Sequence, residues 1–78
     1  MTPIEKYDNA FIEALGVEKG ELAGLKYQGT KAWDSIGHME LIGNLEDEFD
    51  IQMETNDIVD LSSYEKGKEI LKKYGVEL

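Results

Sequence analysis

The sequence predicts an all-α fold, a small four-helix bundle with a long first loop and a short third helix, in one domain spanning residues 1–78. Three observations predict this fold. Apolar residues recur every three or four positions in the main segments. Capping residues precede the expected helices, and glycines follow two of them. No segment has the pattern of a strand, and 78 residues suffice for one domain with a thin core.

The first predicted helix begins after Thr2. Pro3 fits its first turn, because the backbone N–H that proline lacks would be unpaired there. Gly16 is expected to end this helix. The apolar stripe expected to face the core consists of Ile4, Tyr7, Phe11, Ala14 and Leu15.

Residues 17–33 form the long connection, which contains three glycines and no sustained apolar period. Connections of this length are uncommon in a compact domain unless they are functional or pack by their own side chains. We therefore expect Leu22, Leu25 and Trp33 to contact the core. Two positions stay open for Trp33: packed under the loop, or partly exposed toward a partner.

The second predicted helix begins after Asp34, whose carboxylate suits the N-cap position and the positive end of the helix dipole. Gly37 and Gly43 lie inside this helix at a cost of about 1 kcal/mol each relative to alanine, which suggests that something approaches the helix closely at these positions. The apolar stripe consists of Ile36, Met39, Ile42, Leu45 and Phe49, with Leu41 beside it. The polar side consists of Glu40, Asn44, Asp47 and Glu48.

Two further helices are predicted in the last third of the chain. The short third helix lies near residues 56–61, with Asn56 as its candidate cap. The fourth begins after Ser63 and has no capping box, because Lys66 occupies the position that glutamate or glutamine would take. Gly75 is expected to end it. Its inner face consists of Tyr64, Gly67, Ile70, Leu71 and Tyr74.

The charge is strongly negative and unevenly distributed. Seventeen acids stand against eight lysines, with no arginine, so the net charge is −9. This charge argues against nucleic acid and anionic membranes, and it favours partners with basic patches and a monomeric state. Residues 32–64 contain no lysine, whereas the rest of the chain is neutral. The nine acids of that segment are Asp34, Glu40, Glu46, Asp47, Glu48, Asp50, Glu54, Asp57 and Asp60.

The composition also limits the cellular compartments and the kinds of chemistry that are expected for this chain. The chain has no cysteine, which excludes a disulfide framework and a thiolate metal site. No apolar run is long enough to cross a membrane, and the N-terminus lacks the layout of a signal peptide. We therefore expect a cytoplasmic protein.

Ser35 stands at the expected start of the second helix and is the main candidate for chemistry. Ser35-Ile36-Gly37 is half of the G-x-S-x-G motif of hydrolases, but Trp33 occupies the position of the first glycine. His38 follows one turn later on the same helix, where it cannot complete a catalytic triad with a third residue behind it. We therefore expect no enzymatic activity, and a serine that is either a simple helix-start residue or a point of attachment.

The sequence contains no defined metal site. The acids of residues 50–60 lack the central glycine and the terminal glutamate of a calcium loop, although weak, non-specific divalent binding stays open. His38 has no partner at metal-ligand spacing and is expected to be a partly exposed helix residue.

A distinctive set of motifs begins with Asp34-Ser35-Ile36, which is followed by Glu40-Leu41-Ile42. It continues through Leu45-Glu46-Asp47-Glu48-Phe49 to Leu61-Ser62-Ser63-Tyr64 and the last helix. With these motifs the chain resembles acyl carrier proteins over essentially its full length, and Asp34-Ser35-Ile36 stands where that family has Asp-Ser-Leu. The resemblance implies a helical bundle of acyl-carrier type. It also implies that a phosphopantetheinyl transferase attaches 4′-phosphopantetheine from coenzyme A to Ser35, with Asp34 as the helix cap and a recognition residue for the transferase.

The resemblance further implies two sets of contact residues. The expected docking residues for an acyl ligase, acyltransferase or synthase with a basic patch are Ile36, Met39, Glu40, Gly43 and Asp47. The expected lining of an acyl-chain pocket consists of Met39, Ile42, Leu45, Phe49, Ile58, Leu61 and Tyr64.

Trp33, Gly37, His38 and Gly43 depart from the pattern of fatty-acid carriers and favour a specialised member of the family. Such a carrier would serve fatty-acid, polyketide or related specialised biosynthesis. Two alternatives stay open. One is a carrier of aminoacyl or peptidyl groups, and the other is a small acidic interaction module with no prosthetic group.

Overall fold

The computed structural model describes residues 2–78 and is built from four α-helices and one short 3₁₀ helix. These are α1 (Pro3–Leu15), η1 (Lys19–Glu21), α2 (Ser35–Phe49), α3 (Thr55–Asp60) and α4 (Tyr64–Lys72). The described residues form no strand, only an isolated bridge between Lys26 and Ser63. The prediction of an all-α fold with four helices is therefore confirmed. None of these helices has the length and apolar character needed to cross a membrane.

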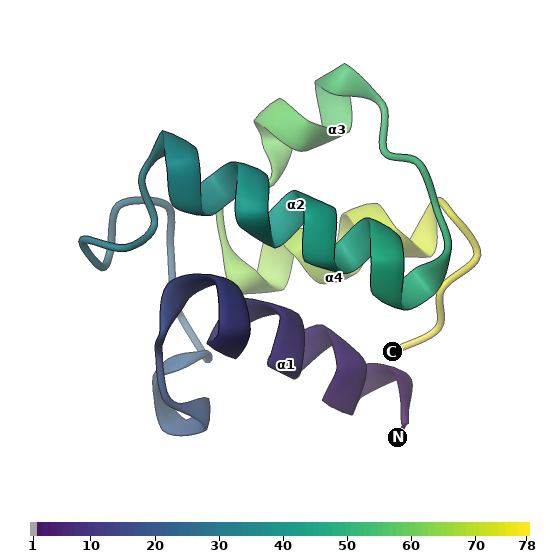
Figure 1. Cartoon of the computed structure of the whole chain (residues 1–78). Helices are drawn as coiled ribbons and strands as arrows, with labels where there is room; N and C mark the ends of the chain where they lie inside the picture. The colour runs from purple at the N-terminus through teal and green to yellow at the C-terminus, as the bar shows by residue number, and fades with distance from the viewer. Residues whose placement is uncertain (1) are drawn as a thin grey trace.

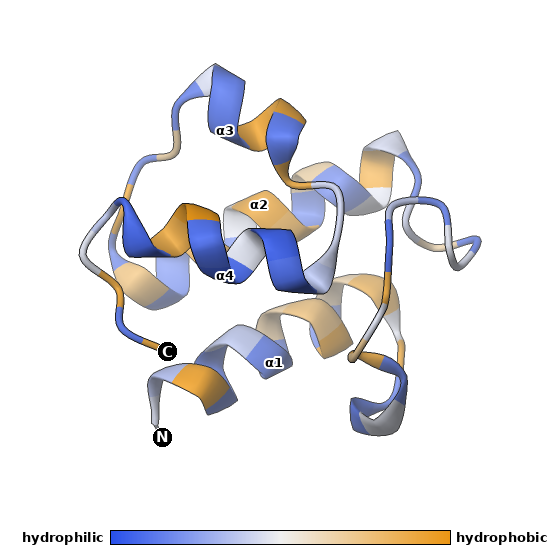
Figure 2. Ribbon diagram, turned by 180° about the vertical axis from the view of Figure 1, so that it is seen from behind, coloured by the Kyte–Doolittle hydropathy of each residue, from blue (hydrophilic) through white to orange (hydrophobic). Residues whose placement is uncertain are grey.

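The four helices surround one apolar core. In Figure 1, α2 lies in the middle, α1 on one side of it and α3 on the other, and α4 lies behind α2. The long loop passes the N-terminal end of α2. Figure 2, seen from behind, shows hydrophilic residues along the outer side of α4. The most deeply buried large side chains are Trp33, Tyr7, Phe11, Leu41, Ile42, Leu45, Leu61 and Leu71.

Local signals define α1 as predicted. Thr2 accepts a hydrogen bond from the Glu5 backbone N–H, and the Glu5 side chain accepts one from the Thr2 backbone N–H in return. This capping box pairs donors that a helix start otherwise leaves open. Gly16 ends the helix in the left-handed conformation, with φ of 65°. The pKa of the Glu5 carboxyl is held below its usual value, chiefly by the Thr2 backbone hydrogen bond.

The long loop is packed by its own side chains, as predicted. Leu22, Leu25 and Trp33 are buried, and Trp33 is fully enclosed with its ring edge-to-face against Phe11 at a centroid distance of 5.5 Å. Trp33 therefore packs under the loop rather than facing a partner. Two backbone bonds join the loop to the start of α4 and the residues just before it: Tyr27 N–H donates to Ser62 O at 2.8 Å, and Tyr64 N–H donates to Leu25 O at 2.9 Å.

Asp34 caps α2 as predicted, accepting a hydrogen bond from the Gly37 backbone N–H at 2.9 Å. The predicted apolar stripe of α2 is wrong at its start, because Ile36 and Met39 are 73% and 57% exposed. The residues that face the core are Gly37, Leu41, Ile42 and Leu45. Each helical residue advances by about 100°, so a core-facing side through Gly37, Leu41 and Leu45 turns Ile36 and Met39 outward.

The two glycines of α2 differ in their surroundings. A Cβ atom at Gly37 would lie well inside 3.0 Å of the Ala32 carbonyl oxygen and 3.2 Å from Leu15 Cδ2. The predicted close approach is therefore confirmed at Gly37, where the loop crosses the helix. At Gly43 no other part of the described chain approaches, since nothing lies within 4 Å of an added Cβ.

The last two helices differ in how their starts are capped. Asn56 does not cap α3, which begins at Thr55 after Glu54 and has no side-chain cap. Ser63 caps α4 as predicted, accepting from the Lys66 backbone N–H at 3.0 Å. Because α4 ends at Lys72, Gly75 lies in the turn after it, with φ of 83°.

Asp57 of α3 is buried and bonded to the end of α4. Lys73 Nζ lies 2.5 Å from one carboxylate oxygen, and the Tyr74 hydroxyl donates to the other at 2.5 Å. These bonds, first from Lys73 and then from Tyr74, hold the pKa of the Asp57 carboxyl below its usual value. The same contact raises the pKa of Lys73.

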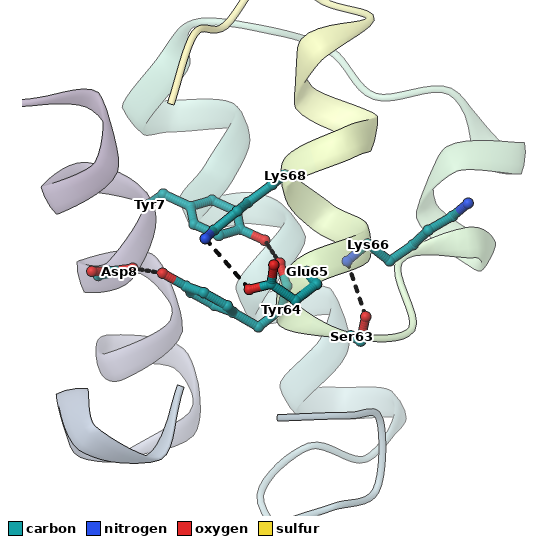
Figure 3. Close-up of polar contacts among 7 residues, drawn as sticks. All are labelled: Tyr7, Asp8, Ser63, Tyr64, Glu65, Lys66 and Lys68. Carbon is teal, nitrogen blue, oxygen red and sulfur yellow. Dashed lines mark hydrogen bonds and ion pairs between the residues drawn. The ribbon is translucent and has the colours of Figure 1, made fainter. Parts of the chain in front are cut away.

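A buried polar cluster joins α1 to α4 (Figure 3). The Tyr64 hydroxyl donates to the buried Asp8 carboxylate, and the Tyr7 hydroxyl donates to the Tyr64 carbonyl at 2.5 Å. Burial raises the pKa of both tyrosines, and for Tyr64 the bond to Asp8 adds to it. Gly67 leaves room for the Tyr7 hydroxyl, which a Cβ at this position would strike. The cluster pairs every buried polar side chain it contains.

Candidate functional site

Ser35 is the first residue of α2 and is exposed. Its hydroxyl makes no hydrogen bond with the part of the chain that the structure describes. Asp34 provides the cap, so the Ser35 hydroxyl is not needed to pair the backbone donors of the first turn. The positive end of the α2 dipole and the unpaired N–H groups at its start favour an anionic group at this position.

An apolar cavity of about 410 Å³ adjoins Ser35, between α2, α3 and the long loop. Most of its exposed wall is hydrocarbon, because serine hydroxyls and one imidazole are almost the only polar groups along it. An apolar chain placed here would be removed from water on several sides. The lining residues are Tyr27, Ser35, His38, Met39, Ile58, Val59, Leu61 and Ser62.

Three of the seven predicted pocket residues line this cavity: Met39, Ile58 and Leu61. The other four lie outside its lining. Ile42 and Leu45 are buried in the core between the helices, and Phe49 is half-buried at the far end of α2. Tyr64 belongs to the polar cluster with Asp8. The positions of Ile42 and Leu45 follow from the rotation of α2, which directs these two side chains into the core.

His38 connects three segments at the rim of this cavity. The Trp33 indole N–H donates to Nδ1 of His38 at 2.9 Å, and Nε2 of His38 lies 2.7 Å from the Ile58 carbonyl oxygen. The Trp33 and His38 rings are nearly parallel, with an interplanar angle of 18°. His38 is half-buried, as the sequence predicts, but no local pattern predicts its two partners. With both ring nitrogens engaged, His38 has none left to activate the Ser35 hydroxyl.

The face around Ser35 combines exposed apolar residues with acids. Ile36, Met39, Glu40 and Asp47 are exposed along α2, whereas Gly43 is half-buried. Val59 of α3 is 74% exposed and lines the cavity with Met39. The sequence did not single out Val59. The signal was present, since Ile58 and Val59 are adjacent on a short helix and cannot both face inward.

No metal site is formed within residues 2–78: no group of three or more His, Cys, Asp or Glu side chains is placed to hold an ion. A hollow at the C-terminal end of α2 is lined by acids, including Glu46, Asp47 and Asp50. The Glu46 carboxylate is engaged there, because it accepts the Met53 backbone N–H at 2.9 Å.

Comparisons with protein-family models, with curated proteins and with solved structures give no match to this chain.

Proposed function

We propose that the chain is a carrier domain of acyl-carrier type that holds acyl groups as thioesters on a 4′-phosphopantetheine arm attached to Ser35. One observation carries the proposal: an exposed, unbonded serine hydroxyl stands at the start of α2 beside an apolar cavity. The Asp34-Ser35-Ile36 motif and its acidic helix supply the resemblance to such carriers.

The residues fit a phosphodiester at Ser35. Asp34 occupies the capping position, which leaves the Ser35 hydroxyl accessible and the first N–H groups of α2 directed toward a bound anion. When attached, the arm supplies the thiol that this cysteine-free chain lacks. Met39, Ile58 and Leu61 then offer hydrocarbon contacts that remove part of an acyl chain from water.

The acids of α2 support docking to enzymes with basic patches. The helix contains four acids and no lysine, and Glu40 and Asp47 are exposed. Opposite charge on a partner would raise the rate of encounter more than the affinity. Exposed Ile36, Met39 and Val59 would add apolar contact area beside the attachment site. The partners proposed are a phosphopantetheinyl transferase and an acyl ligase, acyltransferase or synthase of fatty-acid, polyketide or related biosynthesis.

The proposal is tested by incubating the protein with coenzyme A and a broad-specificity transferase and measuring intact mass. We expect one phosphopantetheinyl group on the parent protein and none on Ser35→Ala. Ser62→Ala is the matched control, because Ser62 is a second exposed serine lining the same cavity. An unmodified parent, in a reaction where a known carrier is modified, would end the proposal.

A second candidate is an acidic interaction module with no prosthetic group. It is favoured by the exposed Ile36, Met39 and Val59, which a basic and partly apolar partner could bind without any modification of Ser35. The same mass measurement separates the two. An aminoacyl or peptidyl carrier shares the arm and differs only in cargo, so loading assays with fatty acids and amino acids distinguish it.

A further inference from the structure

The His38 bridge, defined as the hydrogen bonds of His38 to Trp33 and Ile58, joins the long loop, α2 and α3. Trp33 Nε1 lies 2.9 Å from His38 Nδ1, and His38 Nε2 lies 2.7 Å from the Ile58 carbonyl oxygen. Ile58 is in the last turn of α3, where backbone carbonyls have no partner within the helix. His38 therefore supplies a partner for the end of α3 and for the buried Trp33 indole at the same time.

These partners assign the proton of the imidazole ring. An indole N–H can only donate a hydrogen bond, so His38 Nδ1 must carry a lone pair. A backbone carbonyl can only accept one, so His38 Nε2 must carry the hydrogen. The bridge thus requires the neutral imidazole with its hydrogen on Nε2.

A second proton on His38 is incompatible with the bond to Trp33. Protonation at Nδ1 would set two N–H donors against each other across the 2.9 Å contact. Trp33 is fully buried, so its indole N–H cannot turn to water where it stands. Leaving a buried donor unpaired is unfavourable, and either the His38 ring or the loop must therefore move.

The charged surroundings of His38 come from three elements. From the loop, the Tyr27 ring meets His38 edge-on at a centroid distance of 5.6 Å. From its own helix, Asp34 is bonded to the α2 backbone, and the positive helix start opposes a cation. From α3, Asp57 is already in an ion pair, Asp60 is exposed, and the helix end favours a cation. The backbone dipoles oppose each other, so the Trp33 donor decides which form the bridge accepts.

We propose that His38 is a proton-sensitive latch on the cavity beside Ser35. The neutral ring holds the loop and α3 together, and uptake of a proton breaks the Trp33 bond and loosens the wall formed by His38, Met39 and Ile58. The latch itself needs no prosthetic group, whereas its effect on a bound acyl chain rests on the carrier function proposed above.

The latch is tested on the unmodified protein by ¹⁵N NMR, because Trp33 and His38 are the only tryptophan and the only histidine. Between about pH 8 and about pH 5, a range that spans ordinary imidazole titration, the Trp33 indole resonance should move upfield in step with the His38 ring signals. Amide hydrogen exchange at residues 58–62 should accelerate over the same range. A clear loss of protection there reports loosening of the cavity wall.

Two variants isolate the cause. His38→Phe retains a ring against Trp33 and removes the titrating group, so the indole resonance should stay constant with pH. Trp33→Phe retains His38 and removes the opposing donor, so exchange at residues 58–62 should become insensitive to pH. An indole resonance that stays fixed while the ring titrates, a ring that does not titrate over this range, or an unchanged pH response in either variant would overturn the latch. All of these measurements use protein that carries no phosphopantetheine on Ser35, so their outcome is independent of the test of carrier function.

Discussion

Gly37 offers the sharpest test of how the long loop packs against the start of α2. An alanine Cβ at this position would lie well inside 3.0 Å of the Ala32 carbonyl oxygen, closer than real Cβ atoms approach, and 3.2 Å from Leu15 Cδ2. The opposing oxygen belongs to the backbone and cannot rotate away as the end of a side chain could. Gly37→Ala should therefore displace the loop immediately before Ser35.

Gly43 lies in the same helix and has nothing within 4 Å of an added Cβ, which makes Gly43→Ala the matched control. Both substitutions gain helix propensity, about 0.5–1 kcal/mol each. Only Gly37→Ala meets the overpacking penalty, typically about 1–3 kcal/mol. The free energy of unfolding should thus rise in Gly43→Ala and lie about 1–3 kcal/mol lower in Gly37→Ala than in that control.

Urea unfolding followed by far-ultraviolet circular dichroism and by Trp33 fluorescence measures both variants. The difference corresponds to several degrees in Tm per kcal/mol for a domain of this size. Gly37→Ala should also slow modification of Ser35 more than Gly43→Ala does, because the loop beside the hydroxyl shifts. Equal stability of the two variants would refute the close packing of Ala32 on α2.

Three further predictions concern two buried polar contacts and the surface charge of α2. Because Lys73 holds the pKa of Asp57 below its usual value, the stabilisation is fully present above about pH 4, the ordinary aspartate value, and is lost as the pH falls from there through the lower pKa of the folded protein. Acid titration of Asp57→Asn should therefore show a flatter loss of helicity. Tyr64→Phe leaves a buried carboxylate on α1 without its donor, so urea unfolding at neutral pH should show a loss of about 1–3 kcal/mol; equal stability would contradict the buried bond. Glu40→Lys should slow transfer of the arm, most at low salt where the screening length exceeds about 10 Å, whereas Glu13→Lys on α1 should not; equal rates would show that Glu40 only solvates the surface.

The starts of the helices could be predicted because their signals are local. Thr2, Asp34 and Ser63 each precede an apolar periodic segment, and each accepts the backbone hydrogen bond expected of a cap. The prediction of Asn56 as a cap was wrong, because α3 is too short to show a clear apolar period in the sequence. The helix begins earlier, at Thr55. The side of α2 that faces the core also could not be assigned, since it depends on the contact of Gly37 with the Ala32 carbonyl and with Leu15 of α1.

The sequence predicts Ser35 as the candidate residue from its motif and from the cap beside it, and this stays a prediction. The cavity beside Ser35 could be predicted only in part, because it depends on where α3 and the loop meet. His38, Ile58 and Tyr27 are brought together by packing between segments far apart in the sequence. The Asp8–Tyr64 bond spans 56 positions and has no signal in either local segment.

The most direct measurement of the central claim locates the added group by tandem mass spectrometry after reaction with coenzyme A and a phosphopantetheinyl transferase. We predict a single group, on the peptide that contains Ser35, and its disappearance in Ser35→Ala but not in Ser62→Ala. Absence of the group from the parent protein, or its presence on Ser62 or Ser63, would contradict the assignment of Ser35 as the attachment site.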